Sequence, residues 1–293
     1  MGGHWEKLAI LAWAFAGTIP LLAFSSTCML FLDPDANSTR NFIGGAIAGS
    51  NIVALGLLFG LVLYSSPLTF FRIRTMASPV VLFLATILFV LACLDAKISL
   101  LEGAALWALA TGYAIYFRAY SSEWKYYQRH SNDAAGQVAM GFLPVLSVLS
   151  MAFGFLLIAV IVAYPFASWI AAFGARNHFS GVMLGAQVVA PLLTFPWLIR
   201  ILFSLGSSDT QKARSISSIT HTCLLNILFL PGFLGFFRPL GLGRDMLMID
   251  LPVLLFFTCT FVCTLLIEKQ EGRALPSFII IAYLVYIATG VLR

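Results

Sequence analysis

The stretch AGSNIVALGLLFGLVLYSSPL, residues 48–68, combines small polar residues at its start, a long apolar run and a proline stop. A second stretch, THTCLLNILFLPGFLGFFRPL at 220–240, repeats this plan. The aligned positions are Ser50 with Thr222, Gly60 with Gly232, and Pro67 with Pro239. About 20 apolar residues are enough for a helix to cross the hydrocarbon core of a bilayer. The two stretches therefore predict equivalent membrane-spanning helices in a duplicated chain.

The composition of the whole chain also predicts a membrane protein. Of the 293 residues, 60% are hydrophobic and only 10% are charged, and the mean hydropathy is +0.96. A soluble domain carries about 25% charged residues. The apolar runs are continuous rather than alternating, so they predict helices and not barrel strands. The net charge of +5 belongs to the loops, and we expect no nucleic-acid partner.

The apolar runs predict an all-α polytopic protein with nine spanning segments. We expect these segments at 8–31, 41–66, 78–95, 101–118, 138–165, 180–205, 214–237, 249–267 and 275–292. The fifth segment is expected to continue to about Phe173. A polar linker at 119–137 separates a first repeat of four helices, 1–118, from a second repeat of five, 138–293.

Basic residues in the short loops set the expected orientation. Most of the 17 Lys and Arg residues fall in loops on the side of the N-terminus, including the linker at 119–137. Basic residues are enriched in cytoplasmic loops. The chain is therefore expected to be an integral, multi-pass membrane protein with its N-terminus in the cytoplasm and its C-terminus outside.

A shorter pair of motifs precedes the two matched stretches. AGTIPLL at 16–22 matches LLTFPWL at 192–198. The aligned pairs are Thr18 with Thr194 and Pro20 with Pro196. A proline removes a backbone donor and bends a helix, so these prolines predict helix breaks. The two copies lie an odd number of crossings apart and are therefore inverted, as in many secondary transporters whose substrate site lies at the midplane.

These motifs resemble the duplicated signature of the cation/calcium exchanger superfamily, the sodium/calcium and calcium/proton antiporters. The family's GTSLPE-like turn is matched at 16–21 and 192–197, and its GSNIFN turn at 49–54 and 221–226. The ending RPL is present at 238–240, and the resemblance covers about residues 8–292. It implies an inverted-repeat transporter fold. The family's first helix is missing from the pattern, which implies nine spans and an inward N-terminus.

The resemblance also implies where a cation would bind, and the residues at those places are changed. The glutamate that closes each GTSLPE-like turn is replaced by Leu21 and Trp197. The Asn or Asp of the second turn becomes Ala54 in one copy and stays Asn226 in the other. Divalent cations usually need carboxylate ligands, so we do not expect calcium exchange. The polar groups kept at the matched positions predict a midplane site formed by Thr18, Ser50, Asn51, Thr194, Thr222 and Asn226.

We expect no acidic residue to replace these glutamates inside the spans. All 12 acidic residues, Asp250 included, are assigned to loops or span ends. An ionisable group within the membrane is the usual sign of an ion pathway. The exception is His221, which either takes up a proton or a soft ligand or else hydrogen-bonds a loop. The five cysteines have no disulfide or zinc-ligand spacing, and neither a metal nor another cofactor is expected.

Two functions remain open from the sequence. A divergent secondary transporter would carry a neutral or monovalent solute through a site of hydroxyl and amide groups. In the alternative, Leu21 and Trp197 fill the old cation cavity, and the chain is a transport-inactive pseudo-exchanger, a subunit of a larger membrane complex. A partner subunit or an oligomer would then cover the surface left by the missing first helix. No nucleophile–base motif or phosphate-binding loop is found in the sequence, so we do not expect an enzyme.

Overall fold

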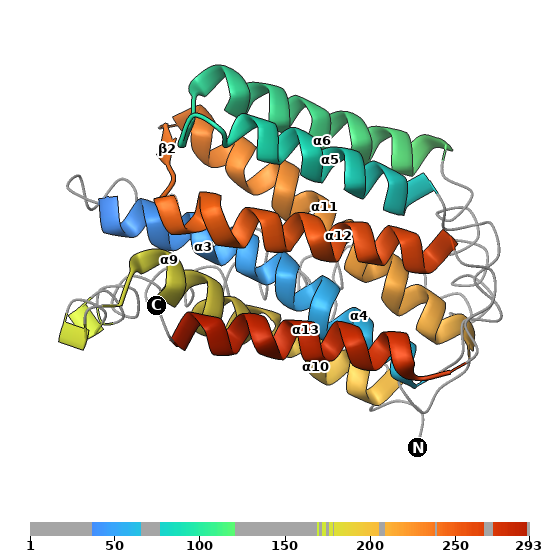
Figure 1. Cartoon of the computed structure of the whole chain (residues 1–293). Helices are drawn as coiled ribbons and strands as arrows, with labels where there is room; N and C mark the ends of the chain where they lie inside the picture. The colour runs from blue at the N-terminus through green and yellow to red at the C-terminus, as the bar shows by residue number, and fades with distance from the viewer. Residues whose placement is uncertain are drawn as a thin grey trace, which may run out of the picture.

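Long helices pack along roughly one direction in the computed structural model of the chain (Figure 1). The structure describes residues 37–65, 77–120, 179–204, 209–237, 239–266 and 272–291, together with 169, 172–173 and 176–177.

In the first half, one continuous helix changes type twice along its length. It consists of α3 (Asn37–Val53), the π-helical turn η1 (Ala54–Leu58) and α4 (Phe59–Tyr64). It is followed by α5 (Ala77–Ala92) and α6 (Leu100–Tyr120). These helices lie where the apolar runs of this part of the chain predicted them.

A capping box fixes the start of α6. The Ser99 amide donates to Oε2 of Glu102 over 2.8 Å, and the Glu102 amide donates to Oγ of Ser99 over 3.4 Å. Such reciprocal bonds satisfy amides that have no partner in the first turn of a helix. Just before this cap, β1 (Lys97–Ile98) pairs antiparallel with β2 (Leu240–Gly241). This pair of two-residue strands is the one departure from the predicted all-α fold within the described ranges.

The second half begins with another helix that contains a π-helical segment. Its parts are α9 (Gly181–Met183), η2 (Leu184–Val189) and α10 (Ala190–Ser204). The remaining elements are α11 (Asp209–Phe237), η3 (Met246–Asp250), α12 (Leu251–Leu266) and α13 (Ala274–Val291). The expected spans at 8–31 and 138–165 lie outside the described residues. The count of nine spans and the division at 119–137 therefore stay predictions.

Several helices have the length and composition of membrane spans. Three are long and apolar enough to cross a bilayer, namely Asn41–Tyr64, Ser215–Phe236 and Met246–Leu266. Shorter apolar helices accompany them at Ser78–Ala92, Gly181–Phe195 and Ala274–Gly290. Large apolar side chains such as Leu84, Leu101, Phe256 and Ile281 are exposed on the outer helices. A surface of this kind suits lipid better than water, and the chain is a multi-pass integral membrane protein.

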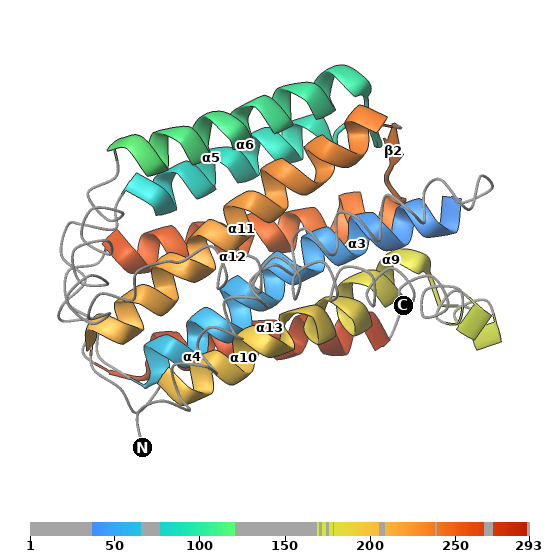
Figure 2. The same ribbon diagram turned by 180° about the vertical axis from the view of Figure 1, so that it is seen from behind.

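The helices paired by the sequence repeat run in opposite directions. β2, which follows α11, contacts α3, and both figures place it at the end of the bundle where α3 begins. Arg273, just before α13, lies over the ring of Tyr64 at the other end, with its guanidinium carbon 5.1 Å from the ring centroid. Figure 2 shows the same arrangement from behind, with α3 and α11 near the centre and α5 and α6 on one side.

Glycines allow the central helices to approach closely. An added Cβ at Gly49 of α3 would lie 2.5 Å from the Cα of Ala186 in η2. At Gly232 of α11, an added Cβ would lie 2.6 Å from the backbone nitrogen of Trp107 in α6. Small residues at such crossings are typical of packing between membrane helices. These contacts hold α3 and α11 in the positions that create the site described next.

Candidate functional site

Two of the predicted polar residues meet where α3 packs against α11. Asn226 donates from Nδ2 to Oγ of Ser50 over 3.3 Å. Both side chains are buried, with 5% and 3% of their surface exposed. The two residues come from the two matched stretches of the sequence. The fold therefore joins polar groups that the sequence assigned to separate copies.

Asn51 lies beside this contact and is fully buried. Its Nδ2 and the Oγ of Ser50 both donate to the carbonyl of Ile47, over 2.8 and 2.9 Å. The Oδ1 atoms of Asn51 and Asn226 accept no hydrogen bond from any residue that the structure describes. An unsatisfied buried polar atom costs about 1–3 kcal/mol. Ser50, Asn51 and Asn226 are called the amide cluster below, and their two free oxygens are positions where a ligand would be stabilised.

The other predicted site residues make no hydrogen bond to this cluster within the described ranges, or lie outside the described residues. Thr194 donates its hydroxyl back to its own helix, to the carbonyls of Ala190 and Pro191 over 3.0 and 3.1 Å. Thr222 is half-buried on α11, one turn before Asn226. No contact within the described ranges brings either threonine into the amide cluster. Thr18, Pro20 and Leu21 belong to the stretch outside those ranges.

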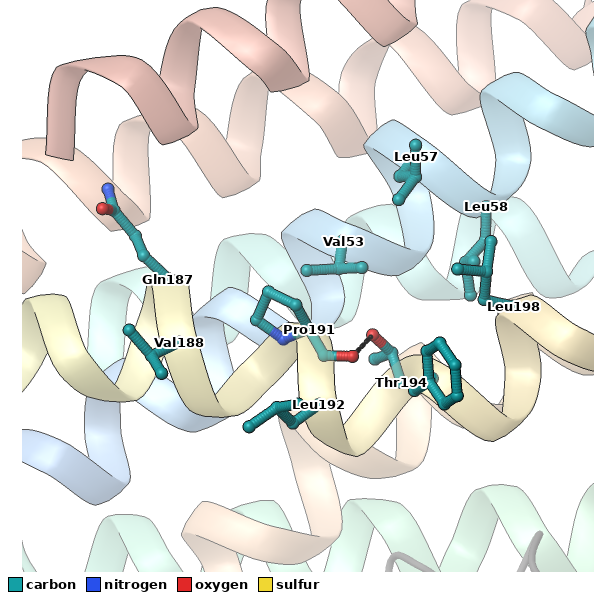
Figure 3. Close-up of a pocket in the computed structure, with 10 residues that line it drawn as sticks. Val53, Leu57, Leu58, Gln187, Val188, Pro191, Leu192, Thr194 and Leu198 are labelled. Atoms are coloured by element: carbon teal, nitrogen blue, oxygen red, sulfur yellow. Dashed lines mark hydrogen bonds between the residues drawn. The ribbon is translucent and has the colours of Figure 1, made fainter. Parts of the chain in front are cut away.

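A cavity of about 380 Å³ lies between the η1 region and the helix formed by η2 and α10 (Figure 3). Its lining residues are Val53, Leu57, Leu58, Gln187, Val188, Pro191, Leu192, Thr194, Phe195 and Leu198. Of these, only Gln187 and Thr194 carry polar side chains. Figure 3 shows the Thr194 hydroxyl bonded to the Pro191 carbonyl and the Gln187 amide directed away from the other lining residues. The cavity offers a ligand mostly hydrocarbon.

The position that carries the family's second glutamate holds a buried tryptophan. Trp197 is 9% exposed and belongs to the main hydrophobic core. No three His, Cys, Asp or Glu side chains come together as metal ligands in the part of the chain that the structure describes. The described residues at this matched position are therefore neutral.

The helix break predicted at Pro196 is wrong, because α10 is α-helical from Ala190 to Ser204. The irregular backbone lies upstream, in the π-helical turns of η2, which end two residues before Pro191. Proline has no N–H for the carbonyl four residues earlier, here that of Gln187, and the wider turn accommodates this loss. The sequence prediction followed the paired Thr-x-Pro motifs and passed over Pro191. Short π-helical turns are frequent at functional sites.

Asp250, which the sequence assigned to a span end, lies deeper than expected. The helix starts at Met246 rather than at residue 249, so the carboxylate lies one turn inside a candidate span and is 0% exposed. Tyr286 of α13, itself 4% exposed, donates from its hydroxyl to Oδ1 of Asp250 over 2.9 Å. The apolar run Met246–Ile249 was the signal in the sequence that the span begins earlier.

His221 lies inside α11 rather than beside a loop. Its ring packs edge-on against Tyr113 of α6, with the ring centroids 6.0 Å apart. The contact joins the two helices through aromatic packing. It lies away from the amide cluster, on the face of α11 that α6 covers.

Comparisons with known proteins identify the fold. No protein-family model and no curated protein sequence matches the chain. The solved sodium-calcium exchanger NCX_Mj is similar over 94% of this chain and 87% of its own, at 18% identity and a TM-score of 0.58. The H+/Ca2+ exchanger CAX is similar over 96% of this chain and 86% of its own, at 14% identity and a TM-score of 0.55. The chain therefore has the fold of the cation/calcium exchangers, which the motifs at 49–54 and 221–226 predicted.

Proposed function

We propose that the protein is a secondary transporter of a neutral or monovalent solute. The observation that carries the proposal is the amide cluster, in which Asn51 and Asn226 keep two buried carbonyl oxygens without a partner in the described part of the chain. These oxygens accept hydrogen bonds from a solute's N–H or O–H groups, or coordinate a monovalent cation. They lack the charge that a divalent cation requires to leave its water.

The arrangement of the helices supports alternating access. α11 packs on α5 and α6, and the helix α3–η1–α4 packs in the corresponding way on α12 and α13. Corresponding helices run in opposite directions, as expected for inverted repeats at 1–118 and 138–293. Transporters built in this way move one repeat against the other around a site at their interface. In the proposed topology the chain has nine spans, and its N-terminus faces the cytoplasm.

A second function, a transport-inactive subunit of a membrane complex, is favoured by different observations. Trp197 is buried in the core, and the neighbouring cavity is almost entirely apolar. The Thr194 hydroxyl is satisfied within its own helix. A protein with these features alone would need no transport cycle, and a partner membrane subunit or a second copy would cover the surface of the missing helix.

Uptake into proteoliposomes tests the two functions against each other. The probes are radioactive sodium and a panel of labelled neutral solutes. We expect uptake of at least one probe above empty liposomes, and a loss of tenfold or more in Asn51→Leu, about 1.4 kcal/mol of binding. The matched control is Thr86→Val, another fully buried polar residue, whose hydroxyl donates to Leu82 on α5.

The outcomes separate cleanly. Uptake that Asn51→Leu abolishes and Thr86→Val retains supports transport through the amide cluster. Uptake equal to that of empty liposomes for every probe, with a stoichiometric partner that copurifies in mild detergent, overturns the transporter and supports the subunit.

A further inference from the structure

The acidic residue Asp250 lies outside the amide cluster, in a different pair of helices. It belongs to η3, the segment that starts the span Met246–Leu266, and it is fully buried. Its hydrogen-bond donor, Tyr286, lies on α13 and is also buried. Asp250 and Tyr286 are called the acid–tyrosine pair below. A charged side chain within a membrane is costly, and such groups are generally retained for ion or proton pathways.

The chemistry of the pair suits a proton better than a metal cation. Sodium and calcium are bound by several oxygen ligands at once. Here the phenol donates its hydrogen to the carboxyl group and so occupies one of the oxygens that a cation would use. No other His, Cys, Asp or Glu completes a group of three around it in the described part of the chain. A proton needs only one carboxyl oxygen, and a neighbouring hydroxyl stabilises either protonation state.

The pair is connected by a hydrogen bond to the cavity that lies between η1 and the helix formed by η2 and α10. Gln187, which lines that cavity, donates from Nε2 to the backbone carbonyl of Tyr286 over 3.3 Å. The same amide packs over Gly290, where any Cβ would collide with it. A shift of α13 would therefore change both the contact of Tyr286 with Asp250 and the position of Gln187 in the cavity wall formed by η2.

Among the described residues, the charged and titratable groups near the pair lie on α13, on α3 and in the segment before η3. α13 contributes Tyr286 and, one turn away, the buried Tyr283. α3, which packs against η3, carries Arg40 in its first turn and no titratable residue from Asn41 to Val53. The segment before η3 carries the exposed Arg244 and the half-buried Asp245.

We propose that Asp250 is a proton-binding carboxyl group that exchanges its proton with water at the end of the bundle where η3 begins, and that Tyr286 positions it. One proton binds to a carboxylate oxygen as the O–H bond forms, and the same proton leaves as that bond breaks. This assignment rests on the proposed transport function, because a proton bound at Asp250 would be the coupling ion of that transport. The carbodiimide experiment below tests it independently of solute uptake.

Carbodiimide labelling of the full chain in liposomes tests the assignment. The probe is N,N′-dicyclohexylcarbodiimide, which enters membranes and reacts with protonated carboxyl groups, and the modified peptide is identified by mass spectrometry. We expect labelling of Asp250 to rise tenfold or more between about pH 9 and about pH 5, a range wide enough for carboxyl groups displaced in either direction. No labelling of Asp250 at any pH, or equal labelling at both ends of the range, overturns the assignment.

Variants show whether Tyr286 acts through Asp250. Tyr286→Phe is expected to move the midpoint pH of labelling by about one unit, whereas a purely structural role leaves that midpoint unchanged. Asp245→Asn is the matched control and should label at Asp250 as the wild type does. If Tyr286→Phe does not fold, Asp250→Glu serves instead, because it keeps a carboxyl group at this position. Labelling of the new glutamate should also depend on pH. If Asp250 is labelled but no solute is taken up, the proton-binding assignment stands and the transporter proposal is overturned. If solute is taken up but Asp250 is not labelled, the transporter proposal stands and the assignment is overturned.

Discussion

The amide cluster and the acid–tyrosine pair are both buried polar sites next to π-helical turns, yet they differ in charge and in symmetry. The amide cluster joins α3 to α11, which the sequence repeat pairs with each other, and it holds only neutral groups. The acid–tyrosine pair belongs to the second copy alone. Aligning Pro79 with Pro252 places Ala77 opposite Asp250 in the first copy. In the proposed functions, the neutral cluster between the two copies binds the solute, and the acid of the second copy alone binds the proton.

The largest effect is expected in α3, which carries Ser50 and Asn51 of the amide cluster and also packs against η3. In Gly49→Ala, the new Cβ would lie 2.5 Å from the Cα of Ala186, so α3 must move away from η2. We expect a loss of about 3 kcal/mol or more in unfolding free energy, because backbone atoms cannot give way. Thermal denaturation in detergent measures it. The control Gly112→Ala on α6, where no atom lies within 4 Å of the new Cβ, should leave stability unchanged or raised. Equal effects of the two substitutions would contradict the close crossing.

A smaller effect tests whether the acid–tyrosine pair is energetically coupled. The hydroxyl of Tyr286 donates to Asp250 over 2.9 Å. A double-mutant cycle of Asp250→Leu and Tyr286→Phe should give a coupling of about 1–3 kcal/mol, the range for buried hydrogen bonds that involve a charged or neutral acid. Denaturation midpoints of the two single variants and the double variant measure it. Additive effects of the two substitutions on unfolding free energy would show that the two side chains lie close together without stabilising each other.

Removing a polar side chain from the amide cluster should not lower the stability of the protein, unlike the same change in the acid–tyrosine pair. Asn51→Leu removes a buried amide whose Oδ1 has no hydrogen-bond donor among the described residues. Replacing such a group with an apolar one of similar size is expected to leave the unliganded protein as stable or more stable, by up to about 1 kcal/mol. The same variant should lose solute uptake. A large loss of stability in detergent would instead assign Asn51 a structural role, and the contrast between the two sites would fail.

The smallest effect concerns the hydrogen bond that links the cavity to the acid–tyrosine pair. Gly290→Ala displaces the end of the Gln187 side chain, which is flexible, so we expect a cost at the lower end of the range for overpacking, about 1 kcal/mol. The hydrogen bond from Gln187 to the Tyr286 carbonyl should be lost. The midpoint pH of carbodiimide labelling at Asp250 should then change without loss of folded protein. An unchanged midpoint pH would show that α13 does not couple the cavity wall to the protonation of Asp250.

Most of the described fold was predictable from hydropathy, and only part of the candidate site was. Apolar runs predicted the helices of the described part of the chain to within a few residues, because a bilayer demands long helices whatever their neighbours. The repeat also predicted that Ser50 and Asn226 would belong to one site. It did not predict the continuous helix across Pro196, because the cost of a proline depends on whether nearby turns can widen. Asp250 was placed at the very start of its span because the span was expected to begin at residue 249 rather than at Met246.

The sequence by itself determined a multi-pass helical protein with the exchanger fold and without the exchanger's glutamates. Those properties depend on composition and on short motifs, which need no knowledge of distant contacts. Tertiary structure alone decided which polar groups of separate helices meet: Asn226 contacts Ser50 and Asp250 contacts Tyr286, while Oδ1 of Asn51 and of Asn226 has no donor among the described residues. Whether a polar atom is paired is a matter of a few tenths of an ångström between helices far apart in the chain. Close helix crossings, such as that of Gly49 with Ala186, are tertiary contacts that no periodicity in the sequence encodes.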